Sequence, residues 1–373
     1  MQAACYIGLM SGTSLDGVDG VLAEFPQEGS GARVLRHATA PLPADLRAEL
    51  LALNRSGADE LHRAALAGNA LSRVYAAVVA DLLAASGRPA SAVQAIGAHG
   101  QTVRHRPLEF DGTGYTLQLQ NPALLAELTG IDVVADFRSR DLAAGGQGAP
   151  LVPAFHQDWF GRTQAAVAVL NIGGIANLSV LAACGAAPIG FDCGPGNALL
   201  DSWCRQHTGQ PFDADGAWGD TGQVLPALLE ALRSEPFFAR TPPRSTGRDL
   251  FNAEWLSAHL ARHGAARAED VQATLTALTV QTCAEALLRH GEACRQLFVC
   301  GGGALNGALM RGLAAALPGV RVQSSAQAGL PPLQVEATAF AWLARQAVER
   351  RTASLPSVTG ARGARILGAV YPA

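Results

Sequence analysis

The chain contains no lysine, because all 28 basic residues among its 373 positions are arginine. A P-loop needs a lysine on the β- and γ-phosphates of its nucleotide, and a protein kinase needs a strand lysine, so both classes are excluded. Chemistry through a lysine Schiff base, including that of pyridoxal enzymes, is excluded for the same reason. Any phosphate site in this chain therefore has to work without lysine.

Cysteine pairs and long apolar runs are missing as well. The seven cysteines form no CxxC motif and their number is odd, which argues against a disulfide or zinc framework and favours the reducing cytoplasm. No run of eighteen apolar residues occurs, and the N-terminus lacks a basic segment and a cleavage site. We therefore expect neither a membrane span nor a secretion signal.

Charge is sparse, at 16% of residues with a formal net charge of -3. This balance gives no electrostatic footprint for nucleic acid or an anionic membrane, so we expect neither as a partner. Hydrophobic residues make up 49% of the chain, which is ample for a buried core. The length exceeds what one core usually fills, so two domains are expected.

Two parts of the chain begin in the same way, with an apolar strand, a glycine-bearing turn and a second strand. The first pair of strands is expected over 4–10 and 18–25, and the second pair over 165–171 and 176–181. Further strands are expected over 33–40, 93–98, 131–135 and 297–300, and helices within 45–86 (broken near 56–57) and over 122–128, 153–160, 197–207, 225–232, 252–263, 268–290, 306–317 and 334–350. The pattern predicts an α/β protein of two domains.

Three glycine-bearing turns follow apolar strands, at 11–14, at 173–174 and at 301–303. Such turns let backbone N–H groups converge on an anion with no Cβ in the way. A single turn of this kind is more often just the end of a strand, but three of them in a lysine-free chain favour phosphate binding. The helix expected from Asn306 would add its positive N-terminus to the third turn.

Several longer strings resemble the signature of the anhydro-N-acetylmuramic acid kinase family, in the family's order. They are GLMSGTSLDGVD (8–19), HGQTV (99–103), DFR (136–138), GGQGAP (145–150), NIGGIAN (171–177), FD (191–192), GPGN (194–197) and CGGG (300–303). The resemblance covers essentially the whole chain. It implies a two-domain actin-like/ribonuclease H-like ATPase fold with an active-site cleft between domains, residues 1–163 with 335–373 forming one domain and 164–334 the other.

The resemblance also implies an activity: ATP-dependent phosphorylation of 1,6-anhydro-N-acetylmuramic acid with hydrolytic opening of the anhydro bridge, in cell-wall recycling. It further implies a cytoplasmic homodimer. Two alternatives remain open. One is a kinase of the same fold for another sugar or a carboxylate, and the other is a non-enzymatic, actin- or chaperone-like ATPase.

In this family two phosphate hairpins and an adenosine loop arise at the three glycine-bearing turns. The residues expected to bind ATP are Gly12, Thr13, Ser14, Leu15, Asp16, Gly17, Val18, Asp19, Gly173, Gly174, Gly301, Gly302 and Gly303. Many relatives in the superfamily hold Mg²⁺ through water from an acid at the position of Met10. Since that acid is absent here, Asp16 is the candidate, with Asp19 as the second possibility.

Asp192 is the candidate general base for the attacking water. Phe191 before it and the glycine–proline segment after it suggest a carboxylate held on a tight, shielded loop, and the resemblance points to the same residue. Its structural alternative is an N-cap of the helix expected from Asn197. The residues expected to bind the sugar are His99, Gln101, Arg138, Asn177, Gly194, Asn197 and Arg248, the arginines facing its lactyl carboxylate.

The chain departs from the family pattern in two places. Cys193 stands where a threonine is expected after the aspartate, and Arg244 and Asp249 replace a lysine and a glutamate in the segment PPRSTGRD (242–249). An arginine presents a fork of donors where a lysine presents a point charge, so contacts at Arg244 are expected to differ from the family's.

Overall fold

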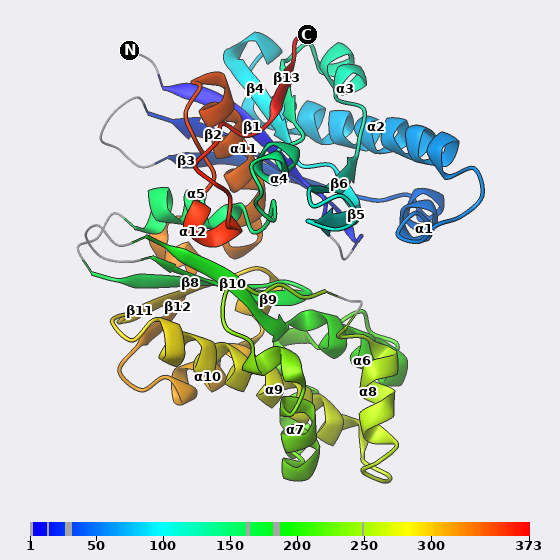
Figure 1. The fold of residues 1–373 in the computed structure, drawn as a ribbon, viewed down its shortest axis with the longest axis vertical. Helices are drawn as coiled ribbons and strands as arrows, with labels where there is room; N and C mark the ends of the chain where they lie inside the picture. Colours follow the sequence, from blue (N-terminus) through cyan, green and yellow to red (C-terminus); the bar gives the residue numbers. More distant parts are fainter. Residues whose placement is uncertain (1–2, 13–14, 27–31, 162–164, 182–186, 248–249) are drawn as a thin grey trace. The chain divides into compact units, whose positions relative to one another are not determined.

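The computed structural model describes residues 3–12, 15–26, 32–161, 165–181, 187–247 and 250–373 (Figure 1). The chain forms two compact units. Unit 1 comprises residues 1–155 and 334–373, and unit 2 comprises residues 156–333. The sequence predicts the domain boundaries between residues 163 and 164 and between residues 334 and 335.

Unit 1 is built on a sheet of order β13-β7-β4-β1-β2-β3. Strands β1, β2 and β3 form an antiparallel meander, whereas β1, β4 and β7 run parallel. The bounds are β1 Ala4–Met10, β2 Gly17–Phe25, β3 Arg33–Pro41, β4 Val93–Ala98, β7 Val133–Ala135 and β13 Ala369–Tyr371. The predicted hairpin of the first two strands is confirmed, and the carboxyl ends of β1, β4 and β7 lie at one edge of the sheet.

Helices cover both faces of this sheet. Neighbouring residues of a strand point to opposite faces, so a single strand can pack against helices on both sides. Ile7 and Leu9 of β1 pack in a core with Leu71 and Val78 of α2, whereas Gly8 between them faces α11. The helices of unit 1 are α1 Ala44–Ala52, α2 Glu60–Ser86, α3 Pro122–Thr129, α4 Ser139–Ala143, α11 Val335–Val348 and α12 Pro356–Thr359, with α5 Val152–Phe160 at its boundary and a separate hairpin of β5 Gln101–Pro107 and β6 Gly114–Leu119.

Helix α2 is the one helix among the described residues that is long and apolar enough to cross a membrane by length and composition alone. Its apolar stripe is already used within unit 1. Leu71, Tyr75, Val78 and Leu82 are fully buried in the core beneath β1 and β2, which is the pattern of an amphipathic core helix.

Two glycines let helix α11 lie directly on the sheet. Gly8 of β1 and Gly97 of β4 are register partners on neighbouring strands. A Cβ on Gly8 would stand 1.8 Å from the carbonyl oxygen of Ala337, and one on Gly97 would stand 2.0 Å from that of Phe340. This close approach of backbones brings the N-terminus of α11 to the edge where the parallel strands end.

Replacing Gly8 by Ala should therefore lower the free energy of unfolding by about 3 kcal/mol or more, because backbone atoms cannot move aside as side chains do. Gly57→Ala is the matched control, since a Cβ there would meet only the flexible end of Arg63 at 3.3 Å. Urea unfolding of both variants gives the comparison. Equal stabilities would show that α11 does not depend on this contact.

Unit 2 repeats the plan of unit 1, with a sheet of order β10-β9-β8-β11-β12. A meander of three antiparallel strands is again followed by two parallel ones. The strands are β8 Val167–Ile172, β9 Ile175–Leu181, β10 Ile189–Pro195, β11 Gln296–Cys300 and β12 Arg321–Ser324, and the helices are α6 Asn197–Thr208, α7 Pro226–Arg233, α8 Ala253–Leu260, α9 Ala268–His290 and α10 Gly307–Ala316. This duplicated α/β topology is that of the actin-like fold predicted from the sequence.

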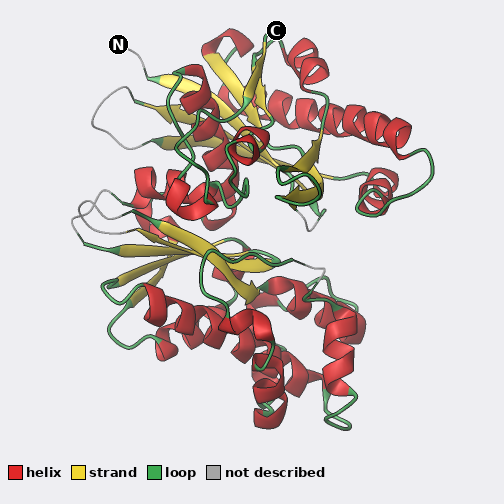
Figure 2. Ribbon diagram, viewed as in Figure 1, coloured by secondary structure: helices red, strands yellow, loops and turns green. Residues whose placement is uncertain are grey.

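The helices of unit 2 lie on one side of its sheet (Figure 2). Leu170, Leu178 and Phe191 of the sheet pack there with Leu275 and Leu278 of α9. The alternate residues of the same strands point to the opposite face, and the polar side chains considered below lie among them.

Candidate functional site

Asp192 lies in strand β10, not on a loop as the sequence suggested. The glycine–proline segment after it continues the strand to Pro195, which pairs with Ile175 of β9. The register shifts between Asp192 and Gly194, as it does at a β-bulge, and a bulge beside a functional side chain re-aims it. Gly194 has a φ of 146°, a conformation that only glycine adopts readily.

Asp192 ends a row of polar residues that crosses three strands. Asn177 of β9 is the register partner of both Asn171 of β8 and Asp192 of β10. Their neighbours Leu170, Leu178 and Phe191 belong to the core on the helical side, so the three polar side chains lie on the other face. Asn171 Oδ1 is buried and has no hydrogen-bond partner within the described ranges of the chain.

The carboxylate of Asp192 accepts a hydrogen bond from the backbone N–H of Thr246 at 2.9 Å. Burial raises its pKa to about 6, and this shift is opposed by the Thr246 N–H and by the charge of Arg244. The N-cap of α6 is Gly196, so the alternative role of Asp192 as a helix cap is wrong. A buried carboxylate with a pKa near the working pH is the pattern of a general base.

Arg244 holds the segment after α7 against β10. Its Nε donates to the carbonyl of Asp192 at 3.0 Å, and its Nη1 donates to the carbonyls of Phe238 and Arg240 at 3.0 and 2.8 Å. Its guanidinium also lies over the ring of Phe191, 5.3 Å from the centroid. The hydrogen bonds of the guanidinium thus go to backbone oxygens of these residues, and none of those that the described residues show goes to the Asp192 carboxylate.

Cys193, the other departure from the family pattern, points into the core. It is fully buried, and its thiol lies against that of Cys283 of α9, a contact that together with burial raises its pKa. A neutral buried thiol behaves as a small hydrophobic group, so Cys193 supports Asp192 from the opposite face of β10.

Two of the glycines at the turns of unit 2 are not required by packing. A Cβ on Gly173 would have only the carbonyl oxygen of Ile175 within 4 Å, at 3.7 Å, and one on Gly302 would have only Asn197 Nδ2, at 3.3 Å. By contrast, a Cβ on Gly301 would stand 2.4 Å from Asn171 Oδ1, and one on Gly303 would overlap Ile172. Gly301 and Gly303 therefore join the third turn to the end of β8.

Asn197, predicted to contact the sugar, lies between these two turns. Its Nδ2 donates to the carbonyl of Ile172 at 3.0 Å, and its backbone N–H donates to the carbonyl of Gly173 at 2.8 Å. These bonds connect helix α6 to the β8–β9 hairpin. The side chain of Asn197 thus shapes the hairpin.

The N-terminus of α10 is closed by protein groups, in contrast to the sequence prediction that it would face phosphate. Asn306 Oδ1 accepts from the N–H of Leu309 at 3.1 Å, and Asp215 Oδ1 accepts from the N–H of Gly307 at 2.8 Å. A carboxylate already occupies the place that an anion would take at this helix end.

In unit 1 the first glycine turn connects β1 to β2. Thr13 and Ser14 lie outside the described residues, whereas Leu15 is buried and donates its N–H to the carbonyl of Gly12 at 3.1 Å. Asp16 is exposed. The beginning of β2 follows, with Gly17, Val18 and Asp19, and Asp19 Oδ1 lies 3.4 Å from Nε2 of His37. Arg248 lies outside the described residues as well.

Arg138 and His99 meet at the edge where β4 and β7 end. Arg138 Nη2 lies 2.9 Å from His99 Nε2, and Arg138 Nη1 donates to the carbonyl of Gly148 at 2.7 Å. Because a guanidinium only donates, His99 accepts on Nε2 and carries its proton on Nδ1. Burial, together with the charge of Arg138, lowers the pKa of His99 to about 3, so its ring is neutral.

Arg138 is a cation with no salt bridge among the described residues. Burial lowers its pKa to about 10, against the charges of Glu336 and Asp141, so it stays charged at neutral pH. Asp141 is itself fully buried and accepts from the N–H of Gly148 at 2.8 Å and from Thr359 Oγ1 at 2.9 Å. A fixed, unpaired cation is a ready site for an anionic ligand.

Gln101 and Glu336 also bring polar side chains to unit 1. Gln101 Oε1 is buried and finds no hydrogen-bond partner in the described part of the chain. Glu336, in the first turn of α11, has a pKa raised by burial and by the charge of Asp19 and lowered by that of Arg138. Sequence reasoning missed Glu336, and the available signal was a single acid in the first turn of an apolar helix, which by itself suggests only dipole compensation.

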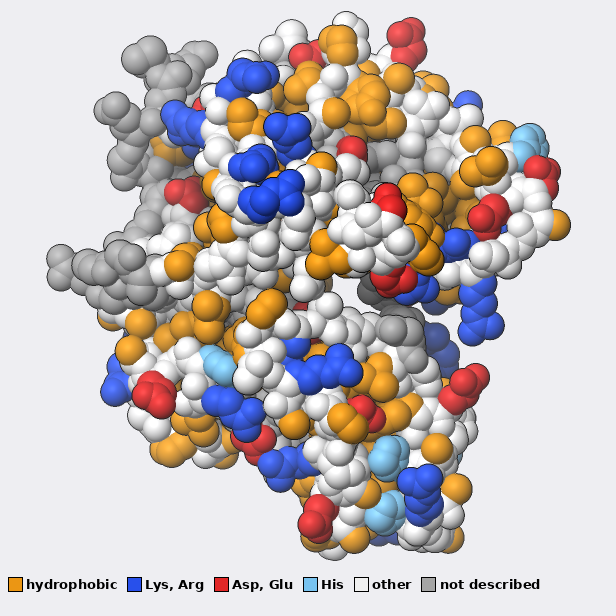
Figure 3. All heavy atoms as spheres, viewed as in Figure 1, with side chains coloured by type: hydrophobic (Ala, Val, Ile, Leu, Met, Phe, Trp, Pro, Cys, Tyr) orange, Lys and Arg blue, Asp and Glu red, His pale blue; other side chains and the backbone are white. Residues whose placement is uncertain are grey.

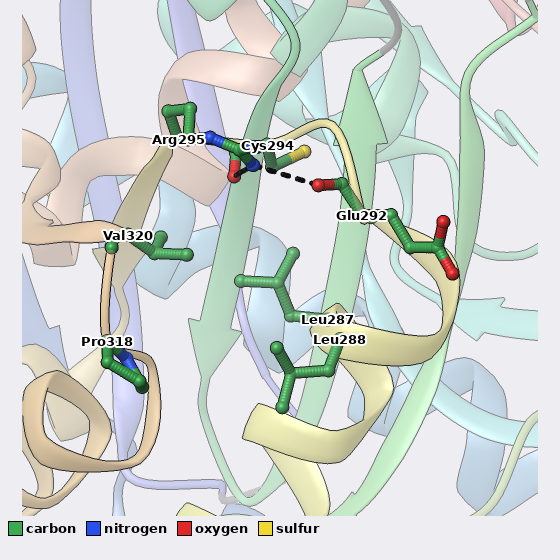
Figure 4. Close-up of a pocket in the computed structure, with 9 residues that line it drawn as sticks. Leu287, Leu288, Glu292, Cys294, Arg295, Pro318 and Val320 are labelled. Carbon is green, nitrogen blue, oxygen red and sulfur yellow. Dashed lines mark hydrogen bonds between the residues drawn. The ribbon is translucent and has the colours of Figure 1, made fainter.

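A pocket of about 280 Å³ lies elsewhere in unit 2, at the end of α9 (Figure 4). Leu287, Cys294 and Val320 contribute to its lining, and Arg295 Nη1 donates to the carbonyl of Glu292 at 2.9 Å. The guanidinium that could recognise an anion there is thus bonded to backbone.

The surface in Figure 3 carries side chains of both signs, in keeping with 28 basic and 31 acidic residues.

Comparison with known proteins gives one consistent result. The model of the family described as anhydro-N-acetylmuramic acid kinase matches residues 4–373. The protein of that name from Variovorax paradoxus (strain S110) is 65% identical over 377 residues, with 100% of both chains covered. The one from Albidiferax ferrireducens is 62% identical with 99% of each chain covered, and the one from Cupriavidus pinatubonensis is 58% identical with 100% and 99% covered.

Proposed function

The chain belongs to the anhydro-N-acetylmuramic acid kinase family, and from this premise we propose the reaction and the part that its residues take. The reaction is transfer of the γ-phosphoryl group of ATP to O6 of 1,6-anhydro-N-acetylmuramic acid, with water adding at C1. The products are N-acetylmuramic acid 6-phosphate and ADP. The observation that carries this proposal is the family match over residues 4–373.

Asp192 takes the proton of the water that attacks C1. As the C1–O6 bond breaks, O6 is released from the bridge and becomes the acceptor of the phosphoryl group. The raised pKa of Asp192, about 6, makes it a stronger base than an exposed aspartate while leaving it ionised at neutral pH. Asn177, its register partner, lies beside it for contact with the sugar.

Backbone N–H groups of the two hairpins, at Gly12 and at Gly173–Gly174, cradle the phosphates. This arrangement suits a chain without lysine, since phosphoryl transfer depends on positioning and charge neutralisation. The open Cβ position of Gly173 supports this role. The glycine turn at 301–303 is proposed for the adenosine part, as the family resemblance implies.

Asp19 and Glu336 are the residues that fit a Mg²⁺ ion accompanying ATP. Their charges interact, which raises the pKa of Glu336, and no hydrogen bond to a described residue neutralises the Glu336 carboxylate. Mg²⁺ is commonly held by one or two carboxylates together with water and phosphate. When bound, it neutralises charge on the phosphates. Asp16, the first candidate from the sequence, is exposed, so Asp19 with Glu336 is the better pair.

Arg138 binds the lactyl carboxylate of the sugar, and His99 and Gln101 bind its hydroxyl groups. The support for Arg138 is its charge without a salt-bridge partner among the described residues and its fixed position between His99 and Gly148. Arg248 remains a second candidate for the carboxylate. Gly194 and Asn197 shape the strand and the hairpin near Asp192.

The chain is further proposed to act as a homodimer in the cytoplasm, as the family resemblance implies. Cys5, Cys193, Cys204, Cys283 and Cys294 are buried thiols that form no disulfide, which suits a reducing compartment.

The test is ADP release from purified protein with ATP, Mg²⁺ and a panel of sugars. We expect ADP only with 1,6-anhydro-N-acetylmuramic acid, in a 1:1 ratio with the sugar phosphate. ADP release with a different amino sugar would instead identify another kinase of this fold. Turnover independent of any sugar would support the chaperone-like ATPase.

A further inference from the structure

Tyr75 presents a buried polar group that the proposed reaction does not use. It lies in α2 and is fully buried among Leu71, Val78 and Leu82. Its hydroxyl lies 2.9 Å from Ser11 Oγ. Burial raises the pKa of the phenol far above its ordinary value, so the hydroxyl keeps its proton.

The direction of the hydrogen bonds around Ser11 follows from a count of protons. Ser11 Oγ donates to the carbonyl of Gly100 at 3.2 Å, and a carbonyl can only accept. A serine hydroxyl has a single proton, so Tyr75 must be the donor to Ser11. The chain of bonds therefore runs from Tyr75 through Ser11 to Gly100.

This chain of bonds connects two loops with different proposed ligands. Ser11 directly follows β1 and begins the turn to Gly12, which is proposed to bind phosphate. Gly100 lies between His99 and Gln101, which are proposed to bind the sugar. The N–H of His99 also donates to the carbonyl of Leu9 at 3.0 Å, so β1 and the loop after β4 are joined at two points.

The same connection extends to Arg138. The Nδ1 of His99 has no hydrogen-bond partner among the residues that the structure describes, and the backbone of Gly100 and of Ser11 lies close enough to the ring to raise the pKa of His99. Its Nε2 accepts from Arg138. Gly100 and His99 therefore lie between Ser11 and the arginine proposed for the sugar carboxylate.

We propose that Tyr75 is a positioning residue that couples the two substrates, so that binding of either one tightens binding of the other. Each ligand fixes its own loop, and the Tyr75–Ser11–Gly100 bonds fix the other loop at the same time. Coupling of this kind is reciprocal and is commonly about 5- to 150-fold in affinity. The inference rests on the proposed function, which supplies the two ligands.

Calorimetry with a non-hydrolysable ATP analogue and 1,6-anhydro-N-acetylmuramic acid tests this coupling. We expect the analogue to bind wild-type protein at least about fivefold more tightly when the sugar is present. In Tyr75→Phe this ratio should fall towards one, while each ligand still binds alone. Tyr6→Phe is the matched control, since Tyr6 is also buried in unit 1 and its burial raises its pKa, but it lies outside this chain of bonds.

A double-mutant cycle separates coupling from a general loss of stability. Ser11→Ala breaks the same chain, so the double variant should lose no more coupling than either single variant. Coupling that persists in Tyr75→Phe, or that is absent from the wild type, would overturn the inference while leaving the proposed function intact. Failure of both ligands to bind the wild type would instead count against the proposed function.

Discussion

We expect Asp192→Asn to lower turnover by about a hundredfold or more, because an amide cannot take the proton of the attacking water. The change keeps the shape of the side chain, and an amide oxygen can still accept the N–H of Thr246 that now bonds Asp192. Binding of ATP and sugar should change far less than turnover. Steady-state kinetics with calorimetry of each ligand separates the two effects.

The pH dependence of turnover gives the same test a second readout. With a pKa of about 6, Asp192 is protonated and inactive as a base below that pH and ionised above it. Turnover of the wild type should therefore rise with pH through about 6, and the residual turnover of Asp192→Asn should lack this rise. An identical rise in both proteins would assign it to another group.

Asp192 also affects the stability of the fold. Stability should fall with rising pH over the range in which turnover rises. Its folded-state pKa is raised from 3.8 to about 6, so the fold favours the protonated form and loses stability as pH rises through this interval. Asp192→Asn should therefore be at least as stable as the wild type at neutral pH. Loss of turnover without loss of stability is the signature expected of a catalytic group.

Gly173→Val should weaken ATP binding by about a hundredfold, because a branched side chain blocks the approach of phosphate to backbone N–H groups. The fold should persist, since a Cβ at Gly173 meets only an oxygen at 3.7 Å. Nucleotide affinity by calorimetry and thermal unfolding are measured together. Unchanged affinity would remove this hairpin from the nucleotide site.

Gly303→Ala provides the contrasting control. A Cβ there would stand 2.4 Å from the Ile172 side chain, so this variant should lose stability even though its new side chain is smaller. If Gly173→Val lost as much stability as Gly303→Ala, its effect on ATP would have to be attributed to folding.

Much of the architecture was predictable, because strands such as β1 and β8 are almost entirely apolar and end at glycine turns. The duplicated hairpins and the long helices α2, α9 and α11 follow from the same hydrophobic patterns. The hairpin of β5 and β6 was missed, because its sequence QTVRHRP is mostly polar. It is a separate two-stranded sheet whose residues include exposed Tyr115 and Leu117.

The identity of the candidate base, Asp192, was easier to predict than the backbone structure around it. The sequence places Gly194 and Pro195 after Asp192, and these residues normally indicate a loop. In the structure they continue an edge strand with a bulge, because Gly194 supplies the φ of 146° that the bulge requires. Local composition cannot distinguish the two, since the conformation of Gly194 and Pro195 depends on their pairing with strand β9.

Contacts between residues far apart in the sequence were invisible for the same reason. Arg244 bonds the carbonyl of Asp192, and Glu336 interacts with Asp19 and Arg138, although the partners are separated by many residues. A single arginine or glutamate carries no signal of such a partner. Only the fold brings them together.

The central claim is that one base, Asp192, drives the ring opening on which phosphoryl transfer depends. The most direct measurement is mass spectrometry of the sugar products and ADP formed by Asp192→Asn from ATP and 1,6-anhydro-N-acetylmuramic acid. The account predicts that ring-opened sugar, sugar phosphate and ADP all fall by the same factor, of about a hundred or more. Sugar phosphate with an intact anhydro ring, or turnover close to that of the wild type, would contradict it.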